Sequence, residues 1–67
     1  METSIIAVGN IFINTETGKK CKVREIFCMF YPDNEIRTIV VFRNENEVEQ
    51  NVNINEVSKL FAKVAGF

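Results

Sequence analysis

The chain has 67 residues, 46% of them hydrophobic, a net charge of −1, two cysteines and no histidine. This length indicates one domain over residues 1–67, and the composition is typical of a folded protein rather than a disordered one. The sequence has no apolar run of about 18 residues and no basic leader before an apolar stretch. We therefore expect neither a membrane span nor a signal peptide.

Four segments have the composition of β-strands, being rich in β-branched and aromatic residues or alternating apolar and polar ones. They are residues 4–13 (with a break at Gly9), 21–31, 36–43 and 48–54. The segments between them, "NTETGKK", "PDNE" and "NENE", are rich in turn-forming residues. The order predicts an antiparallel sheet built from successive hairpins.

The hydrophobic period changes at the end of the chain. Asn55 is a good N-cap, and Gly66 is suited to end a helix. Between them the apolar residues recur at the spacing of one helix face: Val57, Leu60, Phe61 and Val64. The sequence thus predicts a mainly β (α+β) domain: a small bent antiparallel sheet or barrel of three to five strands, with one C-terminal helix.

The stretch "IFCMFY" is apolar on both faces of its strand. Ile26, Cys28 and Phe30 point one way, while Phe27, Met29 and Tyr31 point the other way. With even-numbered hairpin loops, residue 31 pairs with 36, residue 27 with 40, and residue 39 with 52. This register places four cations on the Ile26 face, with Arg24 opposite Arg43: Lys22, Arg24, Arg37 and Arg43.

One short helix covers only one face of such a sheet. Phe27, Met29 and Tyr31 are therefore either core beneath the helix or an interface for a protein partner or a second copy, because Tyr and Met are enriched at interfaces. Arg37 and Arg43 border the apolar centre of the sheet in this register. We expect the partner-binding residues to be Phe27, Met29, Tyr31, Arg37 and Arg43.

A basic segment runs from the first turn into the second strand: Lys19, Lys20, Lys22 and Arg24. For the four cations of the Ile26 face, one interpretation is that Glu25, Glu45 or Glu47 neutralises them at the surface: Lys22, Arg24, Arg37 and Arg43. The alternative is a docking patch for an acidic partner surface or for a phosphate backbone, which Lys19 and Lys20 would extend. In a nucleic-acid site the cations would contact phosphates, and nearby aromatic residues would stack on bases. The net charge of −1 favours the first interpretation.

The residue types argue against catalysis and against metal or cofactor binding. Without histidine there is no Ser–His or Cys–His nucleophile pair, and two cysteines cannot complete a zinc site. Cys21 and Cys28 are about 23 Å apart on an extended strand, too far for a disulfide. We expect both cysteines to be small core residues with free thiols, and the protein to be cytoplasmic.

The stretch "VGNIFINTETGKKCKVREI", followed by a hairpin and "NINEVSKLFAKV", resembles the small Src-homology-3-like barrels of the KOW and Tudor type. It is also similar to short phage proteins that append a helix to such a sheet. The resemblance covers most of the chain. It implies binding of nucleic acid, peptide or protein, not catalysis.

The leading hypothesis is a non-enzymatic protein-binding module of a phage or mobile element. It would dock on a partner protein, such as a host factor that it inhibits, or on a second copy of itself. The alternative is a small nucleic-acid-binding barrel that uses Lys19, Lys20, Lys22 and Arg24.

Overall fold

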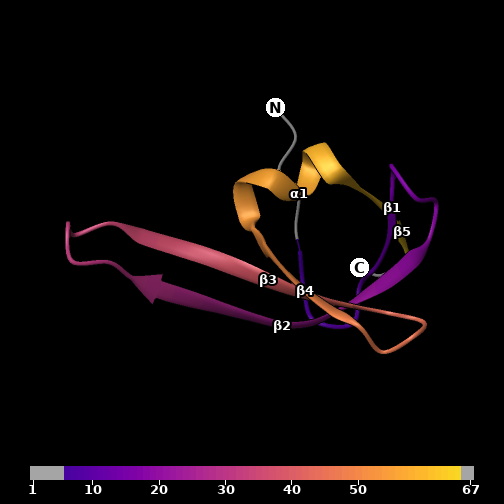
Figure 1. Cartoon of the computed structure of the whole chain (residues 1–67), viewed down its shortest axis with the longest axis horizontal. Helices are drawn as coiled ribbons and strands as arrows, with labels where there is room; N and C mark the ends of the chain where they lie inside the picture. Colours follow the sequence, from indigo (N-terminus) through magenta and orange to yellow (C-terminus); the bar gives the residue numbers. More distant parts are fainter. Residues whose placement is uncertain (1–5, 66–67) are drawn as a thin grey trace.

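The computed structural model describes residues 6–65. Five antiparallel strands form one unclosed sheet in the order β4-β3-β2-β1-β5. The elements are β1 (Ile11–Asn14), β2 (Lys20–Phe30), β3 (Ile36–Asn44), β4 (Glu49–Asn53), α1 (Ile54–Leu60) and β5 (Phe61–Ala65). The short helix links the two edge strands, β4 and β5 (Figure 1). The predicted class, a mainly β sheet with one helix, is confirmed.

The first strand is shorter than predicted. The Asn10 N–H donates to the Ala7 carbonyl at 3.1 Å, and Gly9 has a φ of +99°, so a turn occupies residues 7–10. The Asn10 side chain is fully buried, and its Oδ1 accepts from the Ala7 N–H at 2.9 Å. The expected break at Gly9 is confirmed. Residues 4 and 5 lie outside the described residues.

The β2–β3 loop has an odd number of residues, which makes the predicted register wrong by one position. The Tyr31 N–H donates to the Glu35 carbonyl at 2.8 Å, and the Asn34 N–H to the Tyr31 carbonyl at 3.1 Å. Asn34 is left-handed, with φ +65°, as in a three-residue hairpin loop. Residue 36 therefore pairs with Phe30, and not with Tyr31.

The β3–β4 loop repeats this geometry and the same error. The Asn44 N–H donates to the Val48 carbonyl at 3.0 Å, and Glu47 is left-handed, with φ +63°. Val52 therefore pairs with Val40, and not with Ile39 as predicted. The two errors cancel for β4, which keeps its predicted face, whereas every side chain of β3 lies on the opposite face from the one predicted.

A bulge at Arg24 changes the alternation of β2. Val23 pairs with Phe42 and Glu25 pairs with Val41, so Arg24 is the extra residue. Cys21 and Val23 consequently lie on the same face as Ile26. The predicted pair Arg24–Arg43 does not form, because Lys22 is the residue opposite Arg43.

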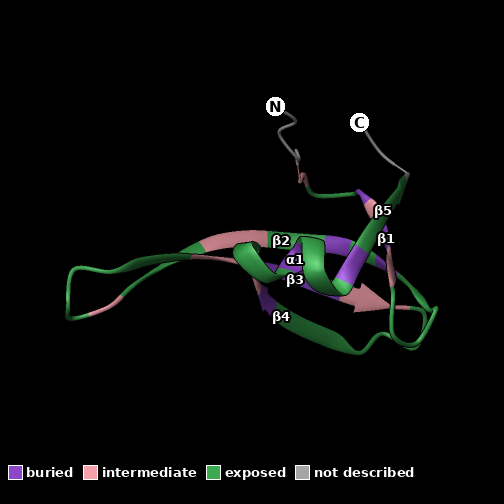
Figure 2. Cartoon of the chain, turned by 90° about the horizontal axis from the view of Figure 1, so that it is seen from above, coloured by how far each residue is buried: buried purple, intermediate pink, exposed green. Residues whose placement is uncertain are grey.

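The core lies between α1 and the sheet face that bears Ile26 and Val40, which we call the inner face. Phe42 is at its centre: its ring meets Phe12 edge-on at 5.4 Å and stacks on Phe61 at 4.2 Å. Figure 2 shows the buried segments gathered beside α1. The buried cluster consists of Phe12, Cys21, Val23, Val40, Phe42, Val52, Val57 and Phe61.

The C-terminal segment is only half helical, which corrects the predicted helix. Asn53, rather than Asn55, is the N-cap, and its side chain accepts from the Asn55 N–H. The helix ends at Leu60, and Phe61 begins a strand that pairs with β1. Pairing with β1 gives residues 61–65 backbone hydrogen-bond partners, as a helix would, and it also places Phe61 in the core. The predicted end at Gly66 lies outside the described residues.

Candidate partner-binding site

The β2–β3 hairpin extends past the rest of the sheet (Figure 1). The pairing of β4 with β3 ends at Ile39, so residues 28–38 have no neighbouring strand on the β3 side within the described chain. We call residues 28–38 the arm. At its end Phe30 is 77% exposed and Ile36 60% exposed, and they face each other across the hairpin. The arm thus presents large apolar side chains outside the core.

The face opposite α1, which we call the outer face, carries most of the predicted partner-binding residues. Phe27 pairs with Ile39, and Met29 pairs with Arg37, so these side chains share the outer face. The helix packs on the inner face, so the interpretation of Phe27, Met29 and Tyr31 as core beneath the helix is wrong. Arg37 was predicted on the other face of the sheet from Met29, and this prediction is also wrong. The two side chains share the outer face, because the β2–β3 loop contains an odd number of residues.

Four side chains at the end of the arm form one contact group, the arm cluster: Met29, Tyr31, Glu35 and Arg37. The Tyr31 hydroxyl donates to Met29 Sδ at 3.9 Å, and the Arg37 guanidinium lies 4.3 Å from the centre of the Tyr31 ring. Arg37 also donates twice to Glu35, from Nε and Nη2, each at 3.1 Å. These hydrogen bonds lower the pKa of the exposed Glu35 carboxyl and hold the Arg37 guanidinium over the ring.

Arg43 belongs to a different group. Glu49 Oε2 accepts from Arg43 Nη2 and from Arg24 Nε, both at 3.0 Å. Glu25 adds a longer contact to Arg24, at 3.8 Å. The carboxylate that bridges the two arginines is therefore that of Glu49, which was not predicted, and of the three predicted partners only Glu25 forms an ion pair with either arginine. Arg43 is on the outer face but does not contact the arm cluster.

The basic segment is only partly brought together. Lys20 and Lys22 lie opposite Ile13 and Ile11 of β1, on the outer face. With Arg24 and Arg43 they line an open groove of about 510 Å³, which also contains Val8, Ile11 and Glu45. Lys19 does not line this groove. With Glu45 at its wall and Glu49 on both arginines, the groove has mixed charge.

The two cysteines differ in environment. Cys21 is buried, its Sγ lies 3.7 Å from the Phe12 carbonyl, and burial raises the pKa of its thiol. Cys28 is exposed on the arm, 3.8 Å from Thr38 Oγ1, so its prediction as a core residue is wrong. Both are free thiols, as expected.

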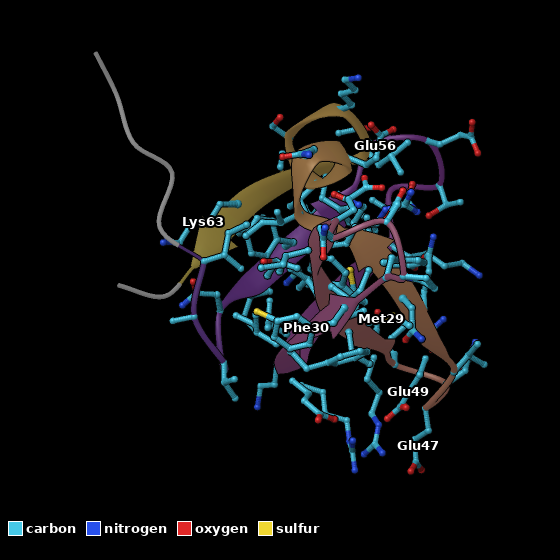
Figure 3. All side chains as sticks on the ribbon, turned by 90° about the vertical axis from the view of Figure 1, so that its left-hand side faces the viewer. Met29, Phe30, Glu47, Glu49, Glu56 and Lys63 are labelled. Atoms are coloured by element: carbon cyan, nitrogen blue, oxygen red, sulfur yellow. The ribbon has the colours of Figure 1, made fainter. Side chains whose placement is uncertain are left out.

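Phe30 and Ile36 are candidate binding residues that the sequence interpretation missed. Figure 3 looks onto the arm from its tip, with Met29 and Phe30 adjacent on β2 and Glu49 on the side away from α1. The predicted strand lengths gave no signal, because the predicted strand 4–13 is nearly as long as 21–31. In the structure, the hairpin strands are longer than their neighbours. β2 has 11 residues and β3 has 9, whereas β4 has 5, so the end of the hairpin must project.

The described part of the chain contains neither a metal-binding group of side chains nor a membrane-spanning helix. Residues 6–65 contain no group of three or more Cys, Asp or Glu side chains placed to hold a metal ion. No helix among them is long and apolar enough to cross a bilayer.

No protein-family model, no curated protein and no solved structure matches this chain. The resemblance to small barrels and to short phage proteins therefore stays a prediction, and the arm itself has to support any functional proposal.

Proposed function

We propose that the protein is a non-enzymatic protein-binding module that docks on its partner through the outer face of the arm. The observation that supports this is the arm cluster, a Tyr, a Met and an Arg held together on a hairpin that no other described element covers. Tyr and Arg are, with Trp, the residues enriched among binding hot spots, and Met is enriched at interfaces.

Pre-organisation strengthens the proposal. Arg37 is hydrogen-bonded to Glu35 and lies over the Tyr31 ring, so part of the side-chain ordering that binding requires is already in place. Phe27 lies along the same face and extends the apolar surface toward the sheet. A fitting partner surface is apolar at its centre and has polar groups at its rim. In a phage setting the partner is a cytoplasmic host protein that the module inhibits by occupying this surface.

The nucleic-acid alternative rests on the groove with Lys20 and Lys22. Its two arginines already share Glu49, which reduces the charge available to phosphates. Nucleic-acid binding is therefore the second candidate, and the experiment below separates it from the first.

The test is capture of a partner from host lysate on immobilised wild-type protein and on two variants with the same charge change. Met29→Asp alters the arm cluster, while Asn51→Asp alters an exposed outer-face position on β4. We expect Met29→Asp to reduce capture of a defined protein at least roughly tenfold, and Asn51→Asp to leave it unchanged.

Circular dichroism of both variants serves as the control for folding. Equal loss of capture in both variants, or no loss in either, would refute docking through the arm. Capture that disappears after nuclease treatment, together with retention of DNA or RNA at low salt, would favour the nucleic-acid alternative instead.

A further inference from the structure

The edge of β2 that faces away from β3, which we call the open edge, has no neighbouring strand along most of the arm. The pairing of β1 with β2 covers residues 20–22, and Val23 exchanges hydrogen bonds of 2.9 Å with Gly9 and Asn10. Beyond Val23, residues 24–30 have no strand beside them on this side within the described chain. An unpaired edge of this length is a template for a further strand.

The direction of the free backbone groups follows from the hairpin geometry. The Tyr31 N–H points across the hairpin to Glu35. Because backbone groups alternate between the two neighbours of an antiparallel strand, those of Phe30, Cys28 and Ile26 point away from β3. The open edge therefore offers three consecutive outward positions. The same three side chains lie on the inner face.

We propose that a second copy of this chain covers the edge, with the two β2 strands antiparallel about a two-fold axis at Cys28. Cys28 then lies opposite Cys28 of the second copy, and Ile26 lies opposite the second copy's Phe30. Opposed residues share a face, so each exposed Phe30 meets an Ile26 that already packs against a core.

The two neighbouring registers are excluded by the chain itself. An axis at Met29 would place Pro32, which has no N–H, opposite Ile26. An axis at Phe27 would place Phe30 of the second copy opposite Arg24, the bulged residue, where the alternation of outward backbone groups is broken. Only the axis at Cys28 lets the three outward positions pair with one another.

Charge favours the same antiparallel arrangement. The loop at the tip of the arm carries Asp33, while the base of the open edge carries Lys22, next to an Arg24 whose charge Glu49 and Glu25 already partly neutralise. Pairing about Cys28 brings the tip of each copy to the base of the other, acidic group beside basic groups. The outer face of each arm stays exposed, so this dimer neither requires nor prevents docking of another protein.

The main test is sedimentation equilibrium on charge variants at the two-fold axis. We expect wild-type protein to dimerise, and Cys28→Lys and Cys28→Glu, each alone, to dimerise at least roughly tenfold more weakly because like charges meet. An equimolar mixture of the two variants should recover the dimer, because Lys then meets Glu. Recovery on mixing is specific to this register.

The matched control is Thr38→Lys, which places the same charge opposite Cys28 but on the other edge of the hairpin. We expect it to keep the wild-type dimer. A monomeric wild-type chain, a mixture that stays monomeric while both variants are folded, or equal weakening by Thr38→Lys would each overturn the proposal.

Native cysteine chemistry gives a second readout that needs no charged variant. Opposed Cα atoms in an antiparallel hydrogen-bonded pair are about 5.5 Å apart. A short bismaleimide should therefore link Cys28 to Cys28 of the second copy, whereas buried Cys21 stays unmodified. We expect a covalent dimer from wild-type protein and none from Cys28→Ser. Absence of the wild-type product at concentrations where sedimentation shows a dimer would refute pairing at Cys28.

Discussion

At the scale of the residue, two left-handed positions determine which side chains enter the core. Asn34 and Glu47 close the two hairpin loops with φ of +65° and +63°. Asn adopts this conformation readily because its short polar side chain can hydrogen-bond to nearby backbone, an advantage that the longer Glu side chain lacks. The sequence "PDNE" therefore contained a usable signal for an odd loop, whereas "NENE" did not favour Glu47 over its neighbours.

The cost of this conformation predicts that Glu47→Gly stabilises the fold. A left-handed non-glycine residue costs about 1–2 kcal/mol, and part of this gain is offset by the greater freedom of glycine in the unfolded chain. We expect the free energy of unfolding, measured with urea, to rise by about 0.5–1 kcal/mol. Glu45→Gly is the control, since it removes the same charge from the same loop at a residue without positive φ. A loss of stability in both variants would contradict the explanation.

At the scale of the element, the C-terminal segment shows how tertiary pairing overrides a local period. Leu60 and Val64 satisfied the helical spacing, yet they are 40% and 51% exposed. Phe61 is buried because β5 pairs with β1 and its ring stacks on Phe42. The period predicted the buried residues Val57 and Phe61 correctly but assigned both to one helix, although Phe61 lies on a strand.

Because Phe61 is buried on a strand and Leu60 is half exposed at the end of the helix, truncating each to alanine should lower the free energy of unfolding by different amounts. Phe61→Ala should lower the free energy of unfolding by about 3–5 kcal/mol, because it removes a stacked core ring. Leu60→Ala should lower it by about 1 kcal/mol or less, since the side chain is half exposed. Urea unfolding of both variants checks the ratio. Similar losses would instead favour one continuous helix with both residues on its buried stripe.

At the scale of the whole molecule, the chain divides its apolar residues between a compact core and a projecting arm. α1 and the curved sheet enclose the core, while residues 28–38 extend beyond both (Figures 1 and 2). The question of what covers the second apolar face of "IFCMFY" thus has a specific form. Within the described chain no element covers either face at the end of the arm.

The division predicts two classes of amide hydrogen exchange. In dilute protein, the amides of Phe27 and Met29, which point toward β3, should exchange by opening of the arm alone. The Val23 amide, bonded to Asn10 in the core, should exchange only with global unfolding. We expect at least roughly tenfold faster exchange for the arm amides by NMR. Equal rates with equal urea dependence would show that arm and core unfold as one unit.

The sequence by itself determined the features that depend on neighbours along the chain. Strand segments, turns, the N-terminal half of the helix and the free thiols follow from propensity, turn chemistry and spacing, and these are local properties. Tertiary structure alone decided which face of β3 is buried, the strand at 61–65, and the exposure of Phe30 and Cys28. Register depends on loop parity and on the Arg24 bulge, and exposure depends on where distant strands end, so no short window of sequence contains them.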